Sequence, residues 1–175
     1  MTQSRERIRH AESEDLEPLT QIYNHYVRHS IATFDTVPFA PKARQAWFAH
    51  HAIGTPHQLW VAEDNGSVLG YVSSSAFRPK PAYDSSVETS IYLDPHHLGK
   101  GLGQRLYSHL FEHLVPFKLH RAFAGIAIPN PASIALHEAQ GFTQVGAFSE
   151  AGYKFGGYHS VHWYEKDLTL IGPHV

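Results

Sequence analysis

Three alternate glycines, Gly99, Gly101 and Gly103, stand between an apolar stretch that ends at Leu93 and a stretch with leucine at every fourth position. Glycine lets the main chain approach a ligand without an intervening Cβ atom. The first turn of a helix also leaves several backbone N–H groups unpaired, and these attract phosphate. The spacing therefore predicts an anion site over residues 99–104, although glycines at tight turns would give the same pattern.

Two familiar phosphate loops do not fit these glycines. No Gly-Lys-Ser/Thr follows the four-residue gap that a Walker loop requires. Gln104 stands where the third glycine of a dinucleotide fingerprint would be needed. The predicted anion site is therefore of another kind.

Histidine is abundant, with 15 residues scattered from His10 to His174. The segment from His109 to His113 spells the H-x-x-E-H pattern of an inverted zinc peptidase. No third ligand is evident, and the His25 and His29 pair has equally little support. We expect no metal site and interpret most histidines as surface or half-buried aromatic residues.

The composition excludes several classes of protein. Of 175 residues, 42% are hydrophobic and 17% are charged, which argues against disorder. Fourteen basic residues against 16 acidic ones argue against a nucleic-acid or anionic-membrane partner. There is no cysteine, so disulfides and thiolate sites are excluded. We expect a single domain over residues 1–175, with its core at about 7–168, located in the cytoplasm.

The periodicity predicts a mixed α/β fold in the order β-α-α-β-β-β-α-β-α-β-β, a mostly antiparallel sheet flanked by helices. Asn65-Gly66 is a strong hairpin signal, and Asp94-Pro95 should end the strand before the glycine loop. The expected strands are residues 5–10, 59–63, 68–76, 87–93, 121–128, 142–148 and 161–168, and the expected helices are residues 16–27, 41–51, 102–114 and 132–140.

Residues 98–103 resemble the Arg/Gln-x-x-Gly-x-Gly/Ala loop of the acetyltransferase (GNAT) family, with Leu98 departing from the usual Arg or Gln. A more specific resemblance extends from about Arg9 to Leu168. The pieces IYNHYV, ATFDTVP, ETSIYL, LYSHL, NPASIALHEAQGF and AGYKFGGYHSVHWYEKDL look like those of phosphinothricin and methionine sulfoximine N-acetyltransferases. The resemblance implies the GNAT fold and acetyl-CoA as the acetyl donor.

The resemblance also implies a cofactor site. The two parallel strands ending at Leu93 and Ile128 would splay to open the cofactor cleft. Asn130 matches an asparagine that contacts the cofactor near its sulfur end. The main chain of Ile91, Tyr92 and Leu93 would pair with the pantetheine arm, and the loop residues Gly99, Lys100, Gly101, Leu102, Gly103 and Gln104 would hold the pyrophosphate.

Acetyl transfer to an amine needs a neutral nitrogen, so a general base helps. Glu88, a carboxylate in an otherwise apolar strand, is the candidate, and the alternative is a side chain that simply points to solvent. His137 occupies the place where many members of the wider family carry a tyrosine that acts as a general acid. It could protonate the departing thiolate, or it could be a packing residue.

Arg78 matches a segment that touches substrate in the resembling enzymes, and a guanidinium suits a carboxylate. Thr89 and Ser90 could add hydroxyl groups, while Phe34 and Tyr83 could form pocket walls. We expect an N-acetyltransferase for a small amino-acid-like amine, such as phosphinothricin, methionine sulfoximine or methionine sulfone, working as a homodimer. The alternatives are acetylation of a peptide N-terminus, polyamine or aminoglycoside, and a non-catalytic acyl-CoA-binding module.

Overall fold

The structure, a computed structural model, describes residues 6–170 and is built on a seven-stranded sheet. The spatial order is β1-β2-β3-β4-β5-β7-β6, and every neighbouring pair is antiparallel except β4 and β5. This confirms the mixed, mostly antiparallel sheet. The strands are β1 (Arg7–His10), β2 (Leu59–Asp64), β3 (Ser67–Ala76), β4 (Ser86–Leu93), β5 (Arg121–Ala127), β6 (Thr143–Lys154) and β7 (Gly157–Asp167).

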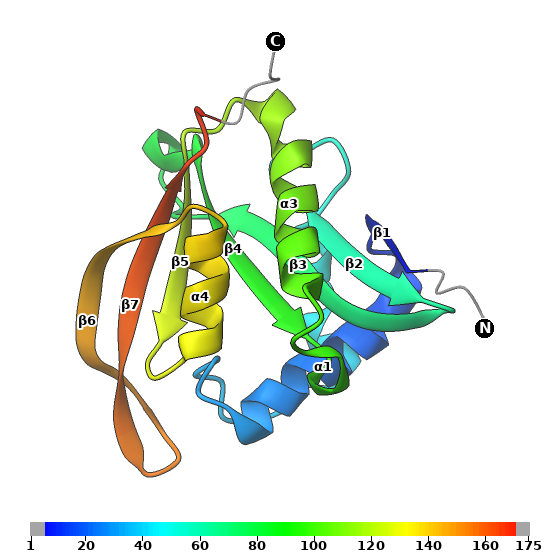
Figure 1. Cartoon of the computed structure of the whole chain (residues 1–175). Helices are drawn as coiled ribbons and strands as arrows, with labels where there is room; N and C mark the ends of the chain where they lie inside the picture. The colour runs from blue at the N-terminus through cyan, green and yellow to red at the C-terminus, as the bar shows by residue number, and fades with distance from the viewer. Residues whose placement is uncertain (1–5, 171–175) are drawn as a thin grey trace.

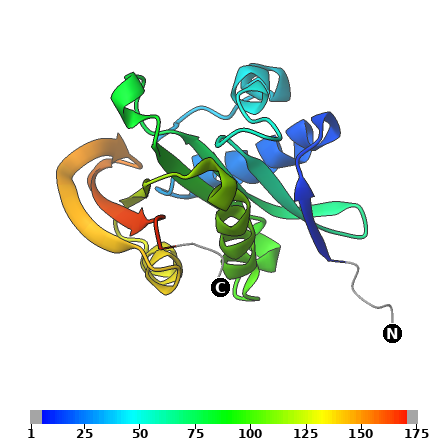
Figure 2. The same ribbon diagram turned by 90° about the horizontal axis from the view of Figure 1, so that it is seen from above.

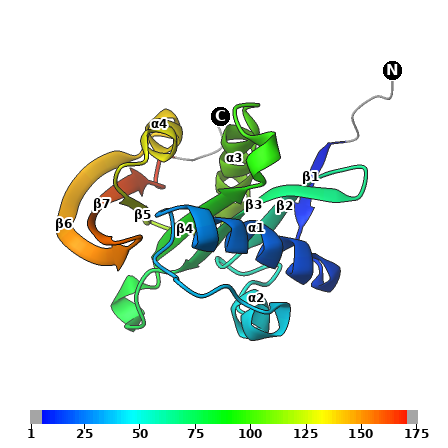
Figure 3. The same ribbon diagram turned by 90° about the horizontal axis from the view of Figure 1, so that it is seen from below.

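Helices cover both faces of this sheet. The α-helices are α1 (Leu16–His29), α2 (Gln45–Ala49), α3 (Leu102–Leu114) and α4 (Pro131–Ala139). Helices α3 and α4 lie on one face, and α1 and α2 lie on the other (Figures 1 and 3). The view from above shows the same layering around the twisted sheet (Figure 2). The order of helices and strands confirms the prediction. No helix within residues 6–170 has the length and apolarity needed to cross a bilayer.

The larger hydrophobic core lies between the sheet and α3. The four leucines of the predicted stripe, Leu102, Leu106, Leu110 and Leu114, are buried there. A smaller core on the opposite face joins α1 to β2 and β3, with Leu19 and Ile22 packed near Val61 and Tyr71. The central strands of the sheet are thus buried on both faces, and α1 packs against β2 and β3.

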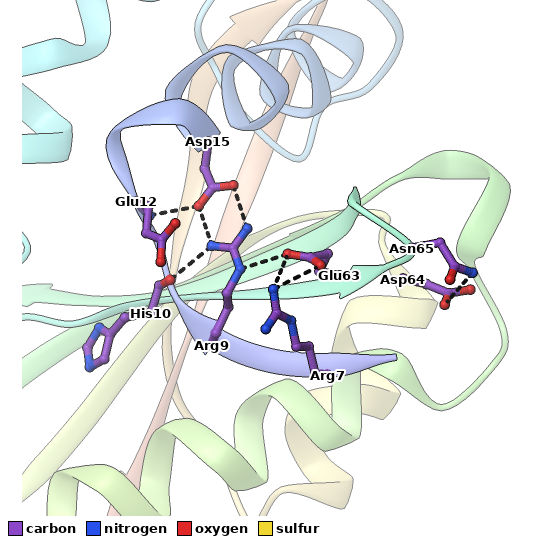
Figure 4. A network of polar contacts seen from close by, with 8 residues as sticks. All are labelled: Arg7, Arg9, His10, Glu12, Asp15, Glu63, Asp64 and Asn65. Atoms are coloured by element: carbon purple, nitrogen blue, oxygen red, sulfur yellow. Dashed lines mark hydrogen bonds and ion pairs between the residues drawn. The ribbon is translucent and has the colours of Figure 1, made fainter. Parts of the chain in front are cut away.

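Charged side chains connect β1, β2 and the turn before α1 (Figure 4). The Arg9 guanidinium makes a bidentate pair with Asp15, at 2.6 and 3.0 Å, and its Nε lies 2.7 Å from Glu63. Asp15 also accepts a hydrogen bond from the Glu12 amide, 2.7 Å long, in the turn before α1. The two carboxylates raise the pKa of Arg9. Arg5, where we expected the first strand to begin, lies outside the described residues.

The bounds predicted for the last two strands and for the second helix are wrong. The last two strands are longer than expected and form one hairpin, with Lys154 paired to Gly157 across a two-residue turn. Phe155 and Gly156 adopt φ of 51° and 78°, as a type I′ turn requires, but a phenylalanine there gives no turn signal. The expected helix over residues 41–51 is a 3₁₀ turn, Pro41–Arg44, followed by the short α2. Pro41 has no N–H to donate. The Ala43 amide donates to the Ala40 carbonyl at 2.9 Å, which forms the 3₁₀ turn.

Lys154 joins this hairpin to α1. Its side chain is buried, and its Nζ donates to the carbonyls of Ser30 and Thr33, both at 2.7 Å. A cation at the C-terminal end of a helix is favourable because the unpaired carbonyls there carry partial negative charge. Lys154 therefore positions the loop after α1 against the hairpin.

Candidate active site

Strands β4 and β5 diverge in the middle of the sheet (Figure 1). Their parallel pairing is limited to Ser86–Arg121, Val87–Ala122 and Glu88–Phe123. Beyond Glu88, β4 continues to Leu93, and no strand within residues 6–170 pairs with it on that side. The expected divergence of the two strands is confirmed, and it leaves the main chain of Ile91, Tyr92 and Leu93 without ladder partners toward β5.

The predicted anion loop lies at the N-terminus of α3. Gly99 and Gly101 adopt φ of 73° and 72°, which favours glycine. Arg105 is the first residue whose amide bonds within the helix, 3.2 Å from the Gly101 carbonyl. The amides of Leu102, Gly103 and Gln104 find no acceptor among residues 6–170. These free donors, with the positive end of the helix dipole, fit a pyrophosphate.

Not every glycine in the loop faces open space. A Cβ at Gly99 would meet nothing within 4 Å, and one at Gly101 would meet only Arg105 Nη1 at 3.4 Å. At Gly103, however, a Cβ would lie 2.9 Å from Leu136 Cδ2. Gly103 therefore lies closely packed against the Leu136 side chain of α4. Its contribution to an anion is its amide group. Lys100 and Gln104 are exposed.

Asn130 forms the N-cap of α4. Its Oδ1 accepts from the Ser133 amide at 3.2 Å. Its side-chain NH₂ group has no acceptor among the described residues, so it can donate to a ligand. The sequence-predicted cofactor residues thus fit acetyl-CoA through main-chain amides, one free side-chain amide and an unpaired strand edge.

Glu88 lies on the sheet face that carries α1 and α2. Its side chain is 36% exposed, and Oε2 lies 3.8 Å from Arg78 Nη1. The pKa of Glu88 is raised above its ordinary value. Burial raises this pKa, and the Arg78 cation lowers it by a smaller amount. Ser90 shares this face, since alternate residues of a strand do so. The structure brings Glu88 and Arg78 together and places Ser90 on the same face, and Glu88 does not simply point to solvent.

Thr89 points the other way and belongs to a buried network with His137. The Thr89 hydroxyl lies 3.3 Å from both Tyr107 Oη and the Phe123 carbonyl. Tyr107 Oη lies 2.8 Å from His137 Nε2. His137 Nδ1 lies 2.7 Å from the Ser133 carbonyl, so Nδ1 carries the hydrogen and Nε2 accepts from Tyr107. The side chains of Thr89 and Glu88 therefore lie on opposite faces of the sheet, and the predicted hydroxyl of Thr89 is not on the Glu88 side.

His137 is a neutral hydrogen-bond acceptor in this network. Burial lowers its pKa, which disfavours the protonated form that a general acid needs. Both ring nitrogens are already engaged inside the protein. The geometry thus supports the packing interpretation of His137 more than the proton-donor one.

A cavity of about 270 Å³ lies between the sheet and the α1–α2 side. Ser75, which faces Glu88 across the β3–β4 pair, lines one part of it. The cavity combines aromatic walls with a few charged and hydroxyl groups, an arrangement typical of small-ligand sites. Its lining residues are Tyr23, Asp35, Phe39, Ala43, Arg44, Trp47, Tyr71, Ser73, Ser75, Ser90 and Tyr92.

Phe34 and Tyr83 do not line this cavity. Phe34 packs on the hairpin, where a Cβ at Gly152 would overlap its ring, and it stacks with His159 at 6.4 Å. Tyr83 is partly exposed and contacts Phe77 edge-on at 5.8 Å. Both predicted wall residues therefore lie outside the cavity, whose walls are other aromatic residues.

Sequence reasoning missed most of the cavity. The alternation of Tyr71, Ser73 and Ser75 on β3 is a period-2 signal that predicts one polar face. It could have been found. Arg44 carries no such signal, because it ends a short 3₁₀ turn whose position depends on packing against α1. Among residues 6–170, no cluster of His, Asp or Glu could hold a metal ion.

Known proteins are similar to this chain over most of its length. The sequence profile of the Acetyltransferase (GNAT) family matches residues 19–142. The chain is 50% identical over 164 residues to phosphinothricin N-acetyltransferase from Streptomyces coelicolor, which covers 93% of this chain and 96% of the relative. It is 39% identical over 150 residues to the L-methionine sulfoximine/L-methionine sulfone acetyltransferase of Salmonella typhimurium, covering 85% and 86%.

A solved structure agrees with these matches. A GNAT superfamily phosphinothricin acetyltransferase from Sinorhizobium meliloti, in complex with AcCoA, superposes with a TM-score of 0.87 at 34% identity. The superposition covers 93% of this chain and 88% of that chain. The chain belongs to the acetyltransferase (GNAT) family, as its motifs predicted, and it is an N-acetyltransferase. Within the family it is similar to the phosphinothricin and methionine sulfoximine acetyltransferases.

Proposed function

We propose that this enzyme transfers the acetyl group of acetyl-CoA directly to the α-amine of a compact amino acid with a polar side-chain end. Phosphinothricin, methionine sulfoximine and methionine sulfone are the proposed acceptors, after the names of the relatives. The observation that carries the proposal is the position of Glu88. This half-buried carboxylate lies where β4 parts from β5 and neighbours the cavity through Ser75 and Ser90.

Glu88 would act as the general base. An α-amine has a pKa of about 7.7–8.0 and is mostly protonated at neutral pH. Glu88 takes a proton from the ammonium group, directly or through one water, and its raised pKa suits this role. Bound acetyl-CoA supplies the reactive thioester. The C–N bond forms as the C–S bond breaks, and the second proton that the nitrogen loses passes through water to the departing thiolate.

Arg78 would bind the α-carboxylate of the same substrate. Its guanidinium lies beside Glu88, and the α-carboxylate and the α-amine of an amino acid are attached to one carbon. A planar guanidinium can hold both carboxylate oxygens. The ring of Phe77 lies 4.1 Å from the guanidinium carbon and orients it.

The cavity favours a small acceptor over the alternatives. Its volume of about 270 Å³ is below the range of about 300–1,000 Å³ that is usual for ligand pockets. An aminoglycoside or a folded peptide terminus would have to remain largely outside it. A polyamine is positively charged and would be repelled by the cations of Arg44 and Arg78.

We also propose that the enzyme is a homodimer in the cytoplasm. The outer strand β6 and its hairpin carry apolar side chains that are each more than half exposed, namely Val145, Phe148, Tyr153, Phe155 and Tyr158. A second copy of the chain would cover these side chains, because apolar side chains gathered on an exposed surface often mark a protein–protein contact. Sedimentation analysis tests the dimer, and cell fractionation tests the location.

Glu88→Gln is the direct test of the function. The change preserves size and removes the base, so turnover with phosphinothricin should fall about 10²-fold or more, with acetyl-CoA affinity little changed. Glu112→Gln, at an exposed position of α3, is the matched control and should keep wild-type turnover. Thiol release from acetyl-CoA is the measurement. A wild-type protein that binds acetyl-CoA but releases no thiol with any candidate amine would support the acyl-CoA-binding alternative.

A further inference from the structure

The cavity contains a buried arginine that makes no ion pair with any acidic residue that the structure describes. Arg44 is 6% exposed and lies over Tyr23 and Trp47, with ring centroids 4.3 and 3.9 Å from its guanidinium carbon. Its Nη1 donates to the Leu19 carbonyl at 3.3 Å. No ion pair to Arg44 occurs among residues 6–170. A guanidinium has five N–H donors, so most of its capacity is available to a ligand.

Tyr71 adds a second unpaired donor in the same cavity. Its side chain is 1% exposed, its hydroxyl oxygen lies near the Arg44 guanidinium, and no group among residues 6–170 accepts a hydrogen bond from the hydroxyl. An unpaired buried hydroxyl costs about 1–3 kcal/mol. Arg44 is near enough to lower the pKa of Tyr71, which burial raises. The two groups therefore lie close together and present positive charge and a donor to the same space.

The neighbouring acidic group does not neutralise this arrangement directly. Asp35 also lines the cavity, but its carboxylate accepts a hydrogen bond from the Tyr23 hydroxyl. No oxygen of Asp35 lies within 4.0 Å of the Arg44 guanidinium. An oxyanion is the ligand that would satisfy both Arg44 and Tyr71.

The strand register places this pair away from the base. Across β3 and β4, Ser75 faces Glu88, Ser73 faces Ser90 and Tyr71 faces Tyr92. Each of these steps along a strand covers two residues, or about 6.8 Å. Tyr71 therefore lies two steps from Glu88. A ligand whose amine is at Glu88 would direct its far end, not its α-carboxylate, toward Arg44 and Tyr71.

We propose that Arg44 and Tyr71 bind the oxygen-bearing end of the substrate side chain, while Arg78 binds the α-carboxylate. The inference rests on the proposed function and assigns the distal specificity site of the same cavity. It explains why an acceptor with a phosphinate or sulfone end would be favoured: its oxygens take up donors that the protein leaves unpaired. An anionic phosphinate gains more from Arg44 than a neutral sulfone does.

Tyr71→Phe tests the proposal with little risk to folding, since the deleted hydroxyl donates to no acceptor in the described part of the chain. The free energy of unfolding, from urea titration, should not fall. The KM for phosphinothricin should rise about tenfold to hundredfold, the value of a hydrogen bond to a charged group. The KM for methionine sulfone should rise less. An unchanged KM for phosphinothricin, or an equal rise for both substrates, would overturn the proposal.

Arg44→Gln supplies the second arm, with Arg28→Gln on the exposed side of α1 as its control. The ratio of kcat/KM for phosphinothricin to that for methionine sulfone should fall at least tenfold in Arg44→Gln and stay constant in Arg28→Gln. If Arg44 were merely structural, Arg44→Gln would lower kcat/KM by the same factor for both substrates. That result would contradict the proposal. Wild-type enzyme that acetylates neither substrate would refute the proposed function itself.

Discussion

The Tyr107→Phe variant separates the two interpretations of His137. Tyr107 is fully buried, and its hydroxyl donates to His137 Nε2 at 2.8 Å. Removing it leaves a buried ring nitrogen unpaired, which costs about 1–3 kcal/mol. For a chain of this size, 1 kcal/mol corresponds to about 2–4 °C in Tm. We expect Tm to fall by about 2–12 °C. Because His137 is a neutral acceptor, kcat should change less than about threefold.

Calorimetric unfolding and steady-state thiol release are the two assays. Thr89→Val is the companion variant: it removes a hydroxyl whose contacts are 3.3 Å long and leaves the Tyr107–His137 bond in place, so its Tm should fall less. The reasoning would be refuted if Tyr107→Phe kept the wild-type Tm but lost about 10²-fold in kcat together with the alkaline limb of its pH profile. That result would make His137 a proton donor that Tyr107 orients.

Three further predictions concern the base, the loop and the hairpin. Arg78→Gln removes the cation that lowers the pKa of Glu88, so this pKa should rise. Because activity is lost when Glu88 gains a proton, the acid limb of the pH profile of kcat/KM should move to higher pH. A shift of that limb to lower pH would contradict the pairing of Arg78 with Glu88. Gly101→Val puts a branched residue at φ of 72°, and calorimetry should show acetyl-CoA binding at least tenfold weaker, about 1.4 kcal/mol; unchanged affinity in folded protein removes the loop assignment. Lys154→Met should lower the free energy of unfolding, measured in urea, by about 2–4 kcal/mol because the carbonyls after α1 lose a charged donor; an equally stable variant would exclude that anchoring role.

Local signals were sufficient for most of the fold. Asn65-Gly66 forms the predicted turn, with φ of 50° and 82°, and Asp94-Pro95 ends β4 as expected. These features depend on a few adjacent residues whose backbone preferences agree with the final structure. The β6–β7 turn was not predicted, for the opposite reason. Phe155 adopts a positive φ that a phenylalanine does not favour, and the long pairing of the two strands enforces this φ.

The candidate site was predictable where it follows one strand or one loop. Glu88 and Ser90 share a face by simple alternation, and that same rule places Thr89 on the opposite face. The role of His137 depends on Tyr107, 30 positions earlier, and no local pattern connects them. Arg44 and Tyr71 likewise meet only because α1 packs on β3. Contacts between distant segments are decided by packing, which a single sequence does not display.

The divergence of β4 from β5 makes the acetyl donor part of the fold's own hydrogen bonding. The two halves of the sheet share only the pairs from Ser86 to Glu88, so the remainder of β4 has an edge that a bound pantetheine arm would occupy like an added strand. A ligand that binds only the folded state adds about 2.7 kcal/mol to stability at 100 times its Kd. The lifetime of the folded enzyme in a cell would then follow the acetyl-CoA supply, and starvation for the donor would expose the protein to unfolding and proteolysis.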